Sequence, residues 1–309
     1  MRPLVVATRR SPLALAQSRA FIAALVARTP GLIVEELHVV TSGDRIQDRP
    51  LYEAGGKGLF VKEIEEALLE RRADLAVHSM KDLPAKQVDS LSIACIPQRA
   101  DPRDVLLVRP GTTASIEALP RAARVGSSSL RRRVALRRHR EDLAIEPLRG
   151  NVDTRLRKLA GGEYDAIVLA AAGLARLGIE PSALPPHLAL EITTMLPAVA
   201  QGILAIEARE GDDAVHALLQ VMEHEPSRRM AIAERGVLEA LDADCTIPLA
   251  AHARLGADSA GAGDTLHLDA WLAELDGTRF REASDVLVSH DPVEIMRWGR
   301  SVGERLKRG

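Results

Sequence analysis

Four side chains that can bind charge or exchange protons follow one short apolar run of the sequence. The run, Leu75–Val77, is suited to a strand buried inside an α/β sheet, and it ends in His78, Ser79, Lys81 and Asp82. Ligands of open α/β sheets bind beyond the carboxyl ends of the strands. The sequence therefore predicts a site here, with Asp82 as its carboxylate. A solvated turn after a strand is the alternative interpretation.

Arginine is concentrated in a second segment, which has eight arginines and no acidic residue between Arg121 and Arg140. Guanidinium groups bind carboxylates and phosphates through paired hydrogen bonds, and Ser127–Ser129 add donors at an expected helix start. The predicted partner is a small polyanion, which Arg131 and Arg132 are expected to contact. The alternative, a solvated basic helix face, is expected for Arg137, Arg138 and Arg140. Further arginines at the ends of expected elements are Arg9, Arg10, Arg149, Arg155 and Arg176.

Two other features could supply reactive groups. Gly55–Gly58 contains Lys57, but a Walker phosphate loop requires GxxxxGK[ST] and here Gly58 follows the lysine. We expect a mobile loop that delivers Lys57 to a cleft. Cys245 lies in an expected loop between a helix and a strand, where a thiol is accessible as a nucleophile or attachment point. Cys95, inside an apolar run, is expected to be buried.

Composition narrows the class of protein. A chain of 309 residues is long enough for two or three domains. The net charge of -2 creates no global field for nucleic acid or an anionic membrane, and an aromatic content of 2% argues against base-stacking surfaces. Two cysteines form no disulfide framework, and the histidines show no metal-ligand spacing. Without an apolar run of about 20 residues or a signal sequence, the expected location is cytoplasmic.

Strand-like runs alternate with helical patterns up to about residue 205. Expected strands are Leu4–Ala7, Ile33–Val40, Leu75–Val77, Leu91–Ile96, Val105–Val108, Ala123–Gly126 and Tyr164–Ala170. Expected helices are Pro12–Val26, with Ser11 as N-cap, Leu59–Glu70, Ser129–His139 and Asn151–Ala160. This is the βαβ pattern of a mostly parallel sheet with helices on both faces.

The order strand, then serine and arginine, then helix occurs twice, at Ala7–Ser11 and at Val125–Arg132. We therefore expect two similar doubly wound α/β lobes facing a cleft, with crossings at Gln98–Arg103 and Leu196–Gly202. After residue 213 the pattern changes to a smaller α+β domain. Its expected helices are Ala214–Met222, Ser227–Leu241 and Val293–Lys307, and its expected strands are Leu249–Arg254, Thr265–Ala273 and Thr278–Ala283. The predicted division is residues 1–99 with 200–212, residues 100–199, and residues 213–309.

Together these segments resemble the porphobilinogen deaminase (hydroxymethylbilane synthase) family along nearly the whole chain. Several matching blocks in the same order make the resemblance specific. Besides the loop of Cys245, the blocks are Ala7–Leu15, Gly55–Ile64, Ala76–Pro84, Ser128–Arg132, Leu148–Val152 and Ala171–Gly178.

The resemblance implies a transferase of tetrapyrrole biosynthesis that joins four porphobilinogen molecules into the linear tetrapyrrole hydroxymethylbilane, with loss of ammonia at each addition. It implies two lobes like those of periplasmic binding proteins and an α+β domain that bears a covalent dipyrromethane cofactor on Cys245. It also implies a monomer that acts on a small molecule and binds neither nucleic acid nor a membrane. Each pyrrole unit carries an acetate and a propionate, so the arginines suit the growing chain.

The resemblance also assigns roles to residues. Asp82 matches the catalytic aspartate, which would hydrogen-bond pyrrole N–H groups and stabilise a cation formed when ammonia leaves. Lys57 and Phe60 would act from the mobile loop, and Gln17 and Thr41–Asp44 would assist. No metal is implied. The residues that would hold cofactor and substrate carboxylates are Arg9, Ser11, Ser79, Lys81, Ser128, Ser129, Arg131, Arg132, Arg149, Arg155 and Arg176.

Three departures from the family pattern and two alternatives stay open. Some relatives carry a lysine at the position of Glu53. Ala243-Asp244 replaces a Gly-Gly pair before Cys245, and a neighbouring carboxylate disfavours the thiolate needed for attachment. Ala200 replaces a glycine in the segment Ala198–Gly202. A two-lobed binding protein without catalysis would explain the lobes and arginines but not Cys245. A nucleic-acid-binding protein would explain only the arginine segment.

Overall fold

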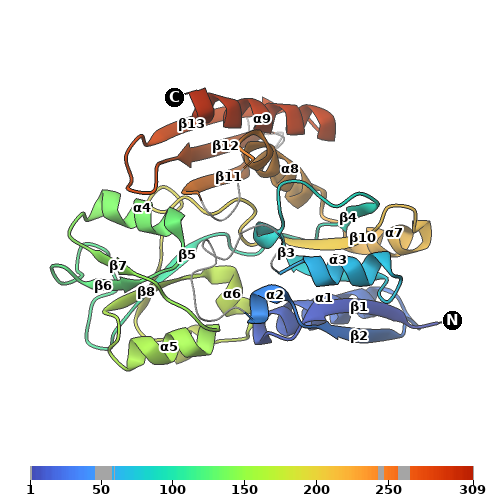
Figure 1. Ribbon diagram of the computed structural model, residues 1–309, viewed down its shortest axis with the longest axis horizontal. Coiled ribbons are helices and arrows are strands. Elements are labelled where there is room, and N and C mark those ends of the chain that lie inside the picture. Colours follow the sequence, from blue (N-terminus) through green and yellow to red (C-terminus); the bar gives the residue numbers. More distant parts are fainter. Residues whose placement is uncertain (1, 46–57, 59, 243–246, 257–264, 309) are drawn as a thin grey trace. The chain divides into compact units, whose positions relative to one another are not determined.

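The computed structural model describes residues 2–45, 58, 60–242, 247–256 and 265–308 (Figure 1). The chain forms two compact units: Met1–Ala100 with Ile203–Ser227, and Asp101–Gly202 with Arg228–Gly309. Of the three breaks, the one after Ala100 lies within an expected crossing, the one after Gly202 lies at the end of the other, and the one after Ser227 lies in neither. The finer division into three segments stays a prediction. Within the described part of the chain, no helix has the length and apolar character that a membrane span needs.

The first unit contains a five-stranded sheet in the order β2-β1-β3-β10-β4. Strands β1, β2 and β3 are parallel, and β10 runs antiparallel to both of its neighbours. The strands are β1 (Leu4–Arg9), β2 (Val34–Val39), β3 (Leu75–Ser79), β4 (Leu91–Cys95) and β10 (Leu204–Arg209), and the helices are α1 (Pro12–Arg28), α2 (Ser42–Arg45), α3 (Lys62–Leu69), α7 (Asp213–Leu219) and the 3-10 turns η2 (Met80–Asp82) and η4 (Gln220–Met222). The sequence did not predict β10.

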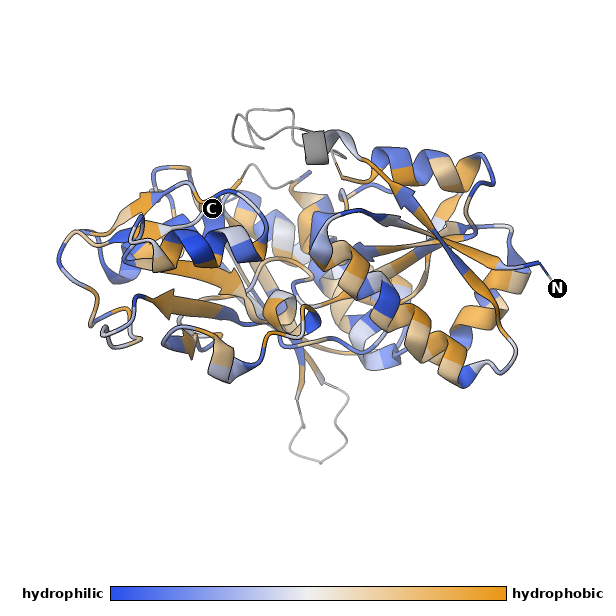
Figure 2. Ribbon diagram, turned by 90° about the horizontal axis from the view of Figure 1, so that it is seen from below, coloured by the Kyte–Doolittle hydropathy of each residue, from blue (hydrophilic) through white to orange (hydrophobic). Residues whose placement is uncertain are grey.

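Helices cover both faces of this sheet because successive strand residues point to opposite sides. Val6 on β1 packs with Phe21 of α1, whereas the next residue, Ala7, packs with Ile64 and Leu68 of α3. Helix α1 begins where the sequence predicts. The hydroxyl of Ser11 caps it by accepting a hydrogen bond from the N–H of Ala14, and Pro12 fills the first helical turn. In Figure 2, apolar residues fill much of the strands while the helices carry both apolar and polar residues.

The second unit contains a sheet of the same design, in the order β7-β6-β8-β5-β9. Here too three neighbouring strands are parallel and the fourth, β5, is antiparallel. The predicted repetition of the fold is therefore confirmed. The strands are β5 (Asp104–Val108), β6 (Arg124–Gly126), β7 (Ala144–Glu146), β8 (Ala166–Ala170) and β9 (His187–Ala189), and the helices are α4 (Leu130–His139), α5 (Val152–Ala160), α6 (Ala171–Arg176) and the 3-10 turn η3 (Pro181–Ala183).

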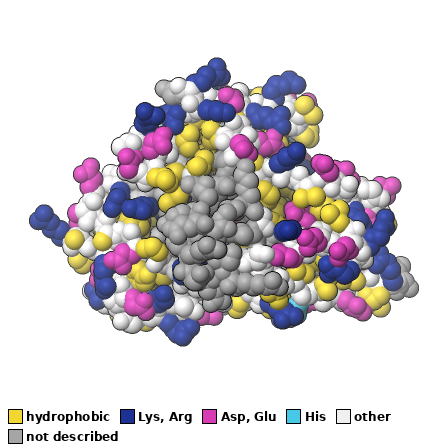
Figure 3. Space-filling model, viewed as in Figure 1, with side chains coloured by type: hydrophobic (Ala, Val, Ile, Leu, Met, Phe, Trp, Pro, Cys, Tyr) yellow, Lys and Arg dark blue, Asp and Glu magenta, His cyan; other side chains and the backbone are white. Residues whose placement is uncertain are grey.

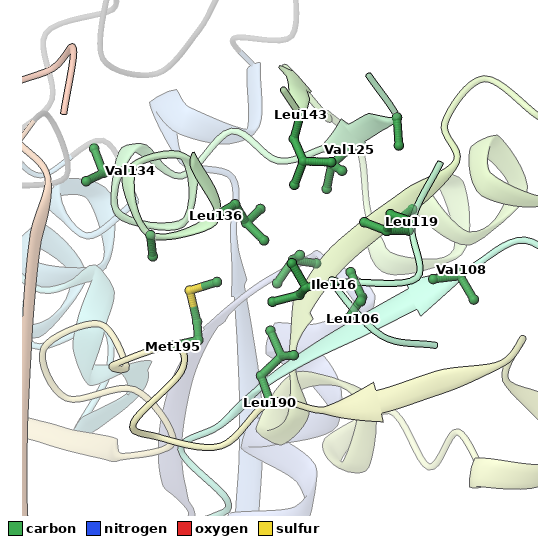
Figure 4. Packing of buried hydrophobic residues seen from close by; sticks show 14 of the residues in the cluster. Leu106, Val108, Ile116, Leu119, Val125, Val134, Leu136, Leu143, Leu190 and Met195 are labelled. Atoms are coloured by element: carbon green, nitrogen blue, oxygen red, sulfur yellow. The ribbon is translucent and has the colours of Figure 1, made fainter. Parts of the chain in front are cut away.

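The second unit also contains a three-stranded antiparallel sheet, β11 (Leu249–Gly256), β12 (Thr265–Leu272) and β13 (Arg281–Val288). Helix α9 (Pro292–Arg308) packs on β12 and β13. Ala250 and Trp271 of this sheet join the same apolar core as Leu136 of α4 and Met195. Leu136 and Met195 are labelled in the view of this core in Figure 4. The fold class, two doubly wound α/β sheets with a smaller C-terminal α+β part, agrees with the prediction.

Helix α8 (Glu225–Ala240) and helix α9 touch backbone to backbone through glycines. A Cβ added to Gly236 would lie 2.8 Å from the backbone N of Arg300, and a Cβ on Gly299 would collide with the carbonyl of Ala233. The two helices therefore pack more closely than side chains at these positions would permit.

Candidate active site

A pocket in the first unit brings together several residues that the sequence singled out. Five of its lining residues, Arg9, Ser11, Phe60, Ser79 and Asp82, belong to the predicted site, and Gln17 was expected to assist. Leu13, Ala14 and Val61 supply an apolar part of the wall.

The position of this pocket follows from the sheet. Strands β1 and β3 are parallel neighbours, with Ala7 opposite Ala76, so their carboxyl ends meet at one edge. Arg9 is the last residue of β1 and Ser79 is the last residue of β3. Asp82 follows in the turn η2 and is exposed, and Lys81 beside it is half-buried. The predicted arrangement of ligand groups at strand ends is therefore present in the structure.

Contacts between these residues order the pocket. Nε2 of Gln17 donates to Oγ of Ser79 over 3.0 Å, which ties α1 to the end of β3. The guanidinium of Arg9 lies over the ring of Phe60, 4.1 Å from its centroid. On another side the ring meets Gly43 so closely that an added Cβ would overlap it. The ring of Phe60 therefore contacts both Arg9 and the segment that contains α2.

His78 forms a buried cluster with two acids, Glu65 and Glu207, and the sequence predicted the histidine at this strand end but not the acids. His78 lines the pocket, and its Nε2 lies 3.0 Å from Oε2 of Glu207 on β10. Burial and repulsion from Glu207 raise the pKa of Glu65 on α3, although His78 opposes the shift. The alternation of Leu204, Ile206 and Ala208 with other residues was the available signal for this strand.

In the second unit, Arg131 and Arg132 are buried against Asp104. Each arginine binds its own oxygen of the carboxylate. Nη2 of Arg131 lies 2.6 Å from Oδ2, and Nη2 of Arg132 lies 2.7 Å from Oδ1. Burial alone would raise the pKa of Asp104, but the charges and hydrogen bonds of the two arginines hold it far below its ordinary value. The sequence pointed to both arginines and missed their carboxylate partner.

The other predicted arginines of this unit are half-buried, and Arg155 lies near both Arg132 and Arg149. Burial and the charges of Arg132 and Arg149 lower the pKa of Arg155 to about 10. Nε of Arg155 donates to the carbonyl of Gly150 over 2.8 Å. Arg176 donates to the carbonyl of Gly202 over 2.7 Å. Guanidinium groups that destabilise one another favour a bound anion, so this cluster fits an acidic cofactor.

The predicted serines make local bonds. Oγ of Ser129 caps α4 by accepting from the N–H of Arg132 over 3.4 Å. Oγ of Ser128 donates to the carbonyl of Leu148 over 2.9 Å and accepts from its N–H over 3.1 Å. The two serines therefore fix the start of α4 and the segment that leads to Arg149.

The expectation of a solvated basic face is wrong for one of its three arginines, Arg140, which is half-buried. The guanidinium of Arg140 donates to the carbonyls of Ile116, Glu117, Leu119 and Pro120 and pairs with Asp142 at 2.7 Å. The guanidinium of Arg138 lies over the ring of Phe280, 3.5 Å from its centroid. Arg137 and Arg138 are exposed, as expected. Cys95 is buried, as predicted. Cys245 and Lys57 lie outside the described residues.

Comparison with known proteins decides the family. The model of the porphobilinogen deaminase dipyrromethane cofactor binding domain matches residues 4–217, and the model of the porphobilinogen deaminase C-terminal domain matches residues 229–308. The chain belongs to the porphobilinogen deaminase family.

Curated porphobilinogen deaminases resemble the chain over nearly their full length. A protein of Sorangium cellulosum is 52% identical over 99% of this chain and 99% of its own. A protein of Nitratidesulfovibrio vulgaris is 49% identical over 90% of this chain and 86% of its own. Among solved structures, a periplasmic binding protein of Salmonella typhimurium with high arginine specificity matches 72% of this chain and 92% of its own. The sequence identity is 15% and the TM-score is 0.40. The porphobilinogen deaminase assignment therefore rests on the family models and the close relatives.

Proposed function

We propose that this chain is a hydroxymethylbilane synthase, which joins four porphobilinogen molecules head to tail, releases ammonia at each addition and serves tetrapyrrole biosynthesis. The observation that carries the proposal is the pocket in which Asp82 lies with Arg9 and Ser11 at adjacent strand ends. Family membership supports the same reaction.

In this proposal, the pocket residues bind and orient a pyrrole. Arg9 and Ser11 would hold its acetate and propionate groups, since a guanidinium binds a carboxylate through two parallel hydrogen bonds. Asp82 would accept hydrogen bonds from pyrrole N–H groups and stabilise positive charge that develops as ammonia leaves. Gln17 and Ser79, which are hydrogen-bonded to each other, would form part of the pocket wall. Phe60 would close the pocket together with Lys57.

The dipyrromethane cofactor would be held by Cys245 through a thioether and by the basic residues of the predicted site. When bound, it supplies the primer on which the tetrapyrrole grows. The lowered pKa of Arg155 supports an anion at this cluster. The proposed carboxylate ligands are Lys81, Ser128, Ser129, Arg131, Arg132, Arg149, Arg155 and Arg176.

The same proposal covers partners and location. A small substrate, a monomeric enzyme and a cytoplasmic location suit a chain of net charge -2 with two cysteines. Lys and Arg side chains lie interspersed with Asp and Glu on the face drawn in Figure 3, an arrangement unlike a nucleic-acid-binding surface. We propose that neither nucleic acid nor a membrane is a partner.

Intact mass spectrometry of the purified protein tests the proposal. We expect added mass equal to two pyrrole units, retained in the Cys95→Ser control and lost in Cys245→Ser. We also expect the unsubstituted protein to consume porphobilinogen and release hydroxymethylbilane. A two-lobed binding protein without catalysis would bind porphobilinogen but remain unmodified and inert. That result would overturn the proposal.

A further inference from the structure

Asp104 joins the arginines of α4 to both ends of the 101–202 segment. It is fully buried and is the first residue of β5. Its Oδ2 accepts from Arg131 over 2.6 Å, and its Oδ1 accepts from Arg132 over 2.7 Å and from Nε2 of Gln201 over 2.9 Å. Nε2 of Gln201 also donates to the carbonyl of Pro102 over 2.6 Å. Asp104 has no role in the site that the family resemblance implies.

These contacts use only part of each guanidinium, which has five N–H groups. Arg131 gives one to Asp104 and one to the carbonyl of Leu196 over 2.6 Å. Arg132 gives two to Asp104 and one to the carbonyl of Val168 over 2.9 Å. Within the described part of the chain, Nε of Arg131 is buried without a hydrogen-bond partner. The bonds to Asp104 and to the carbonyls therefore orient each guanidinium while using only two N–H groups of Arg131 and three of Arg132.

The charges around Asp104 do not balance. One carboxylate faces two guanidinium groups, and Arg155 adds positive charge near Arg132. An isolated buried charge is costly, so a cluster with this surplus gains from an anion that brings its own acceptors. The negative charge of Asp104 lets Arg131 and Arg132 be buried. It does not neutralise the whole positive charge of the arginine cluster.

We propose that Asp104 is a positioning residue, which orients Arg131 and Arg132 so that their remaining N–H groups are held ready for ligand carboxylates. This inference rests on the proposed function. A fixed guanidinium loses less conformational freedom on binding than a mobile one, so orientation raises affinity. Gln201 and the carbonyls of Pro102 and Leu196 anchor the same carboxylate and arginines to both ends of the segment.

The test compares Asp104→Asn with Asp165→Asn. Asp165 is a second ion-paired carboxylate of the same unit, 2.6 Å from Arg109, and it also accepts from the N–H of Arg124 over 2.8 Å. Two readouts are needed. One is the fraction of protein that carries dipyrromethane by intact mass. The other is the rise in melting temperature that citrate, a small polycarboxylate, gives to each variant in a Cys245→Ser background.

We expect Asp104→Asn to lower the loaded fraction and to reduce the citrate effect by more than half, while Asp165→Asn leaves both unchanged. If Asp104→Asn lowers only the melting temperature, with loading and the citrate effect as in the control, Asp104 is merely structural and the inference fails. If that variant does not fold, Gln201→Met, which removes one hydrogen bond to Oδ1, should show the same two losses in smaller degree. Full loading and a full citrate effect in Gln201→Met would overturn the inference.

The citrate readout separates this inference from the proposed function. An unloaded wild-type protein that leaves porphobilinogen untouched would contradict the proposed function. Citrate would still report whether Asp104 orients the arginines in such a protein.

Discussion

Arg9 lies over the ring of Phe60, with its guanidinium carbon 4.1 Å from the ring centroid. The contact joins the end of β1 to the residues that precede α3. Because both side chains line the pocket of Asp82, the ring controls where the positive charge of Arg9 stands. This control depends on Gly43, since the ring occupies the space that a Cβ there would need.

Gly43→Ala should therefore impair substrate binding more than stability. The added methyl group displaces the ring of Phe60 and with it Arg9, so we expect a KM for porphobilinogen several times higher. The matched control is Gly211→Ala, where an added Cβ meets no atom within 4 Å. Steady-state kinetics of the two variants checks this, and equal KM values would contradict the role of the ring.

Asp82→Ala should abolish turnover and leave the fold intact. The side chain is exposed in a turn, so its removal costs little packing, whereas the positive charge that develops in the reaction loses its carboxylate. We expect a melting temperature within a few degrees of wild type. Asp89→Ala, at an exposed position nearby, should keep full activity. Near-normal turnover in Asp82→Ala would mean that another group performs this role.

Glu65→Gln should change how stability depends on pH. Because burial and Glu207 raise the pKa of Glu65 in the folded state, its contribution to stability is fully present below the unfolded value of about 4.3 and is lost as pH rises through the folded value. Glutamine cannot ionise, so the variant avoids this loss.

Thermal melts across pH measure this effect. We expect Glu65→Gln to melt above wild type at pH 8 and the difference to shrink towards pH 4. Glu35→Gln, at an exposed position of β2, should follow wild type throughout. A difference that is constant with pH would exclude Glu65 as its source.

Gly299→Ala should destabilise the packing of α8 against α9. Its Cβ would collide with the carbonyl of Ala233, and backbone atoms cannot move aside as a flexible side chain can. Overpacking of this kind costs about 1–3 kcal/mol. Denaturant unfolding should show that loss, while Ser301→Ala, on the exposed face of the same helix, should show almost none.

Local patterns in the sequence predicted most of the fold. Buried strands such as Leu75–Val77 and the N-cap at Ser11 were recognisable because apolar runs and capping residues act over a few positions. Strand β10 was missed because it follows the second crossing and its partners are more than 100 residues away in sequence. The strand order that the two sheets share could be recognised only from the hydrogen-bonded pairing of the strands in the structure.

The candidate site was predictable to a similar degree. Arg9 and Ser79 are the last residues of their strands, Ser11 and Asp82 follow within three residues, and the structure places all four in one pocket. Asp104 was not predictable, because its role depends on side chains that come near it only in the folded chain. The interaction of Arg138 with Phe280 escaped prediction for the same reason.

The insertion of β10 between β3 and β4 sets an order of events during synthesis. Strand β3, which leads to Asp82, receives its second neighbour only after Arg209 has left the ribosome, and by then all of the 101–202 segment has emerged. Until that moment one edge of β3 has unpaired N–H and C=O groups, which makes it a target for pairing with other chains. A nascent chain that ends before residue 204 therefore exposes an aggregation-prone strand edge next to the residues that will line the pocket.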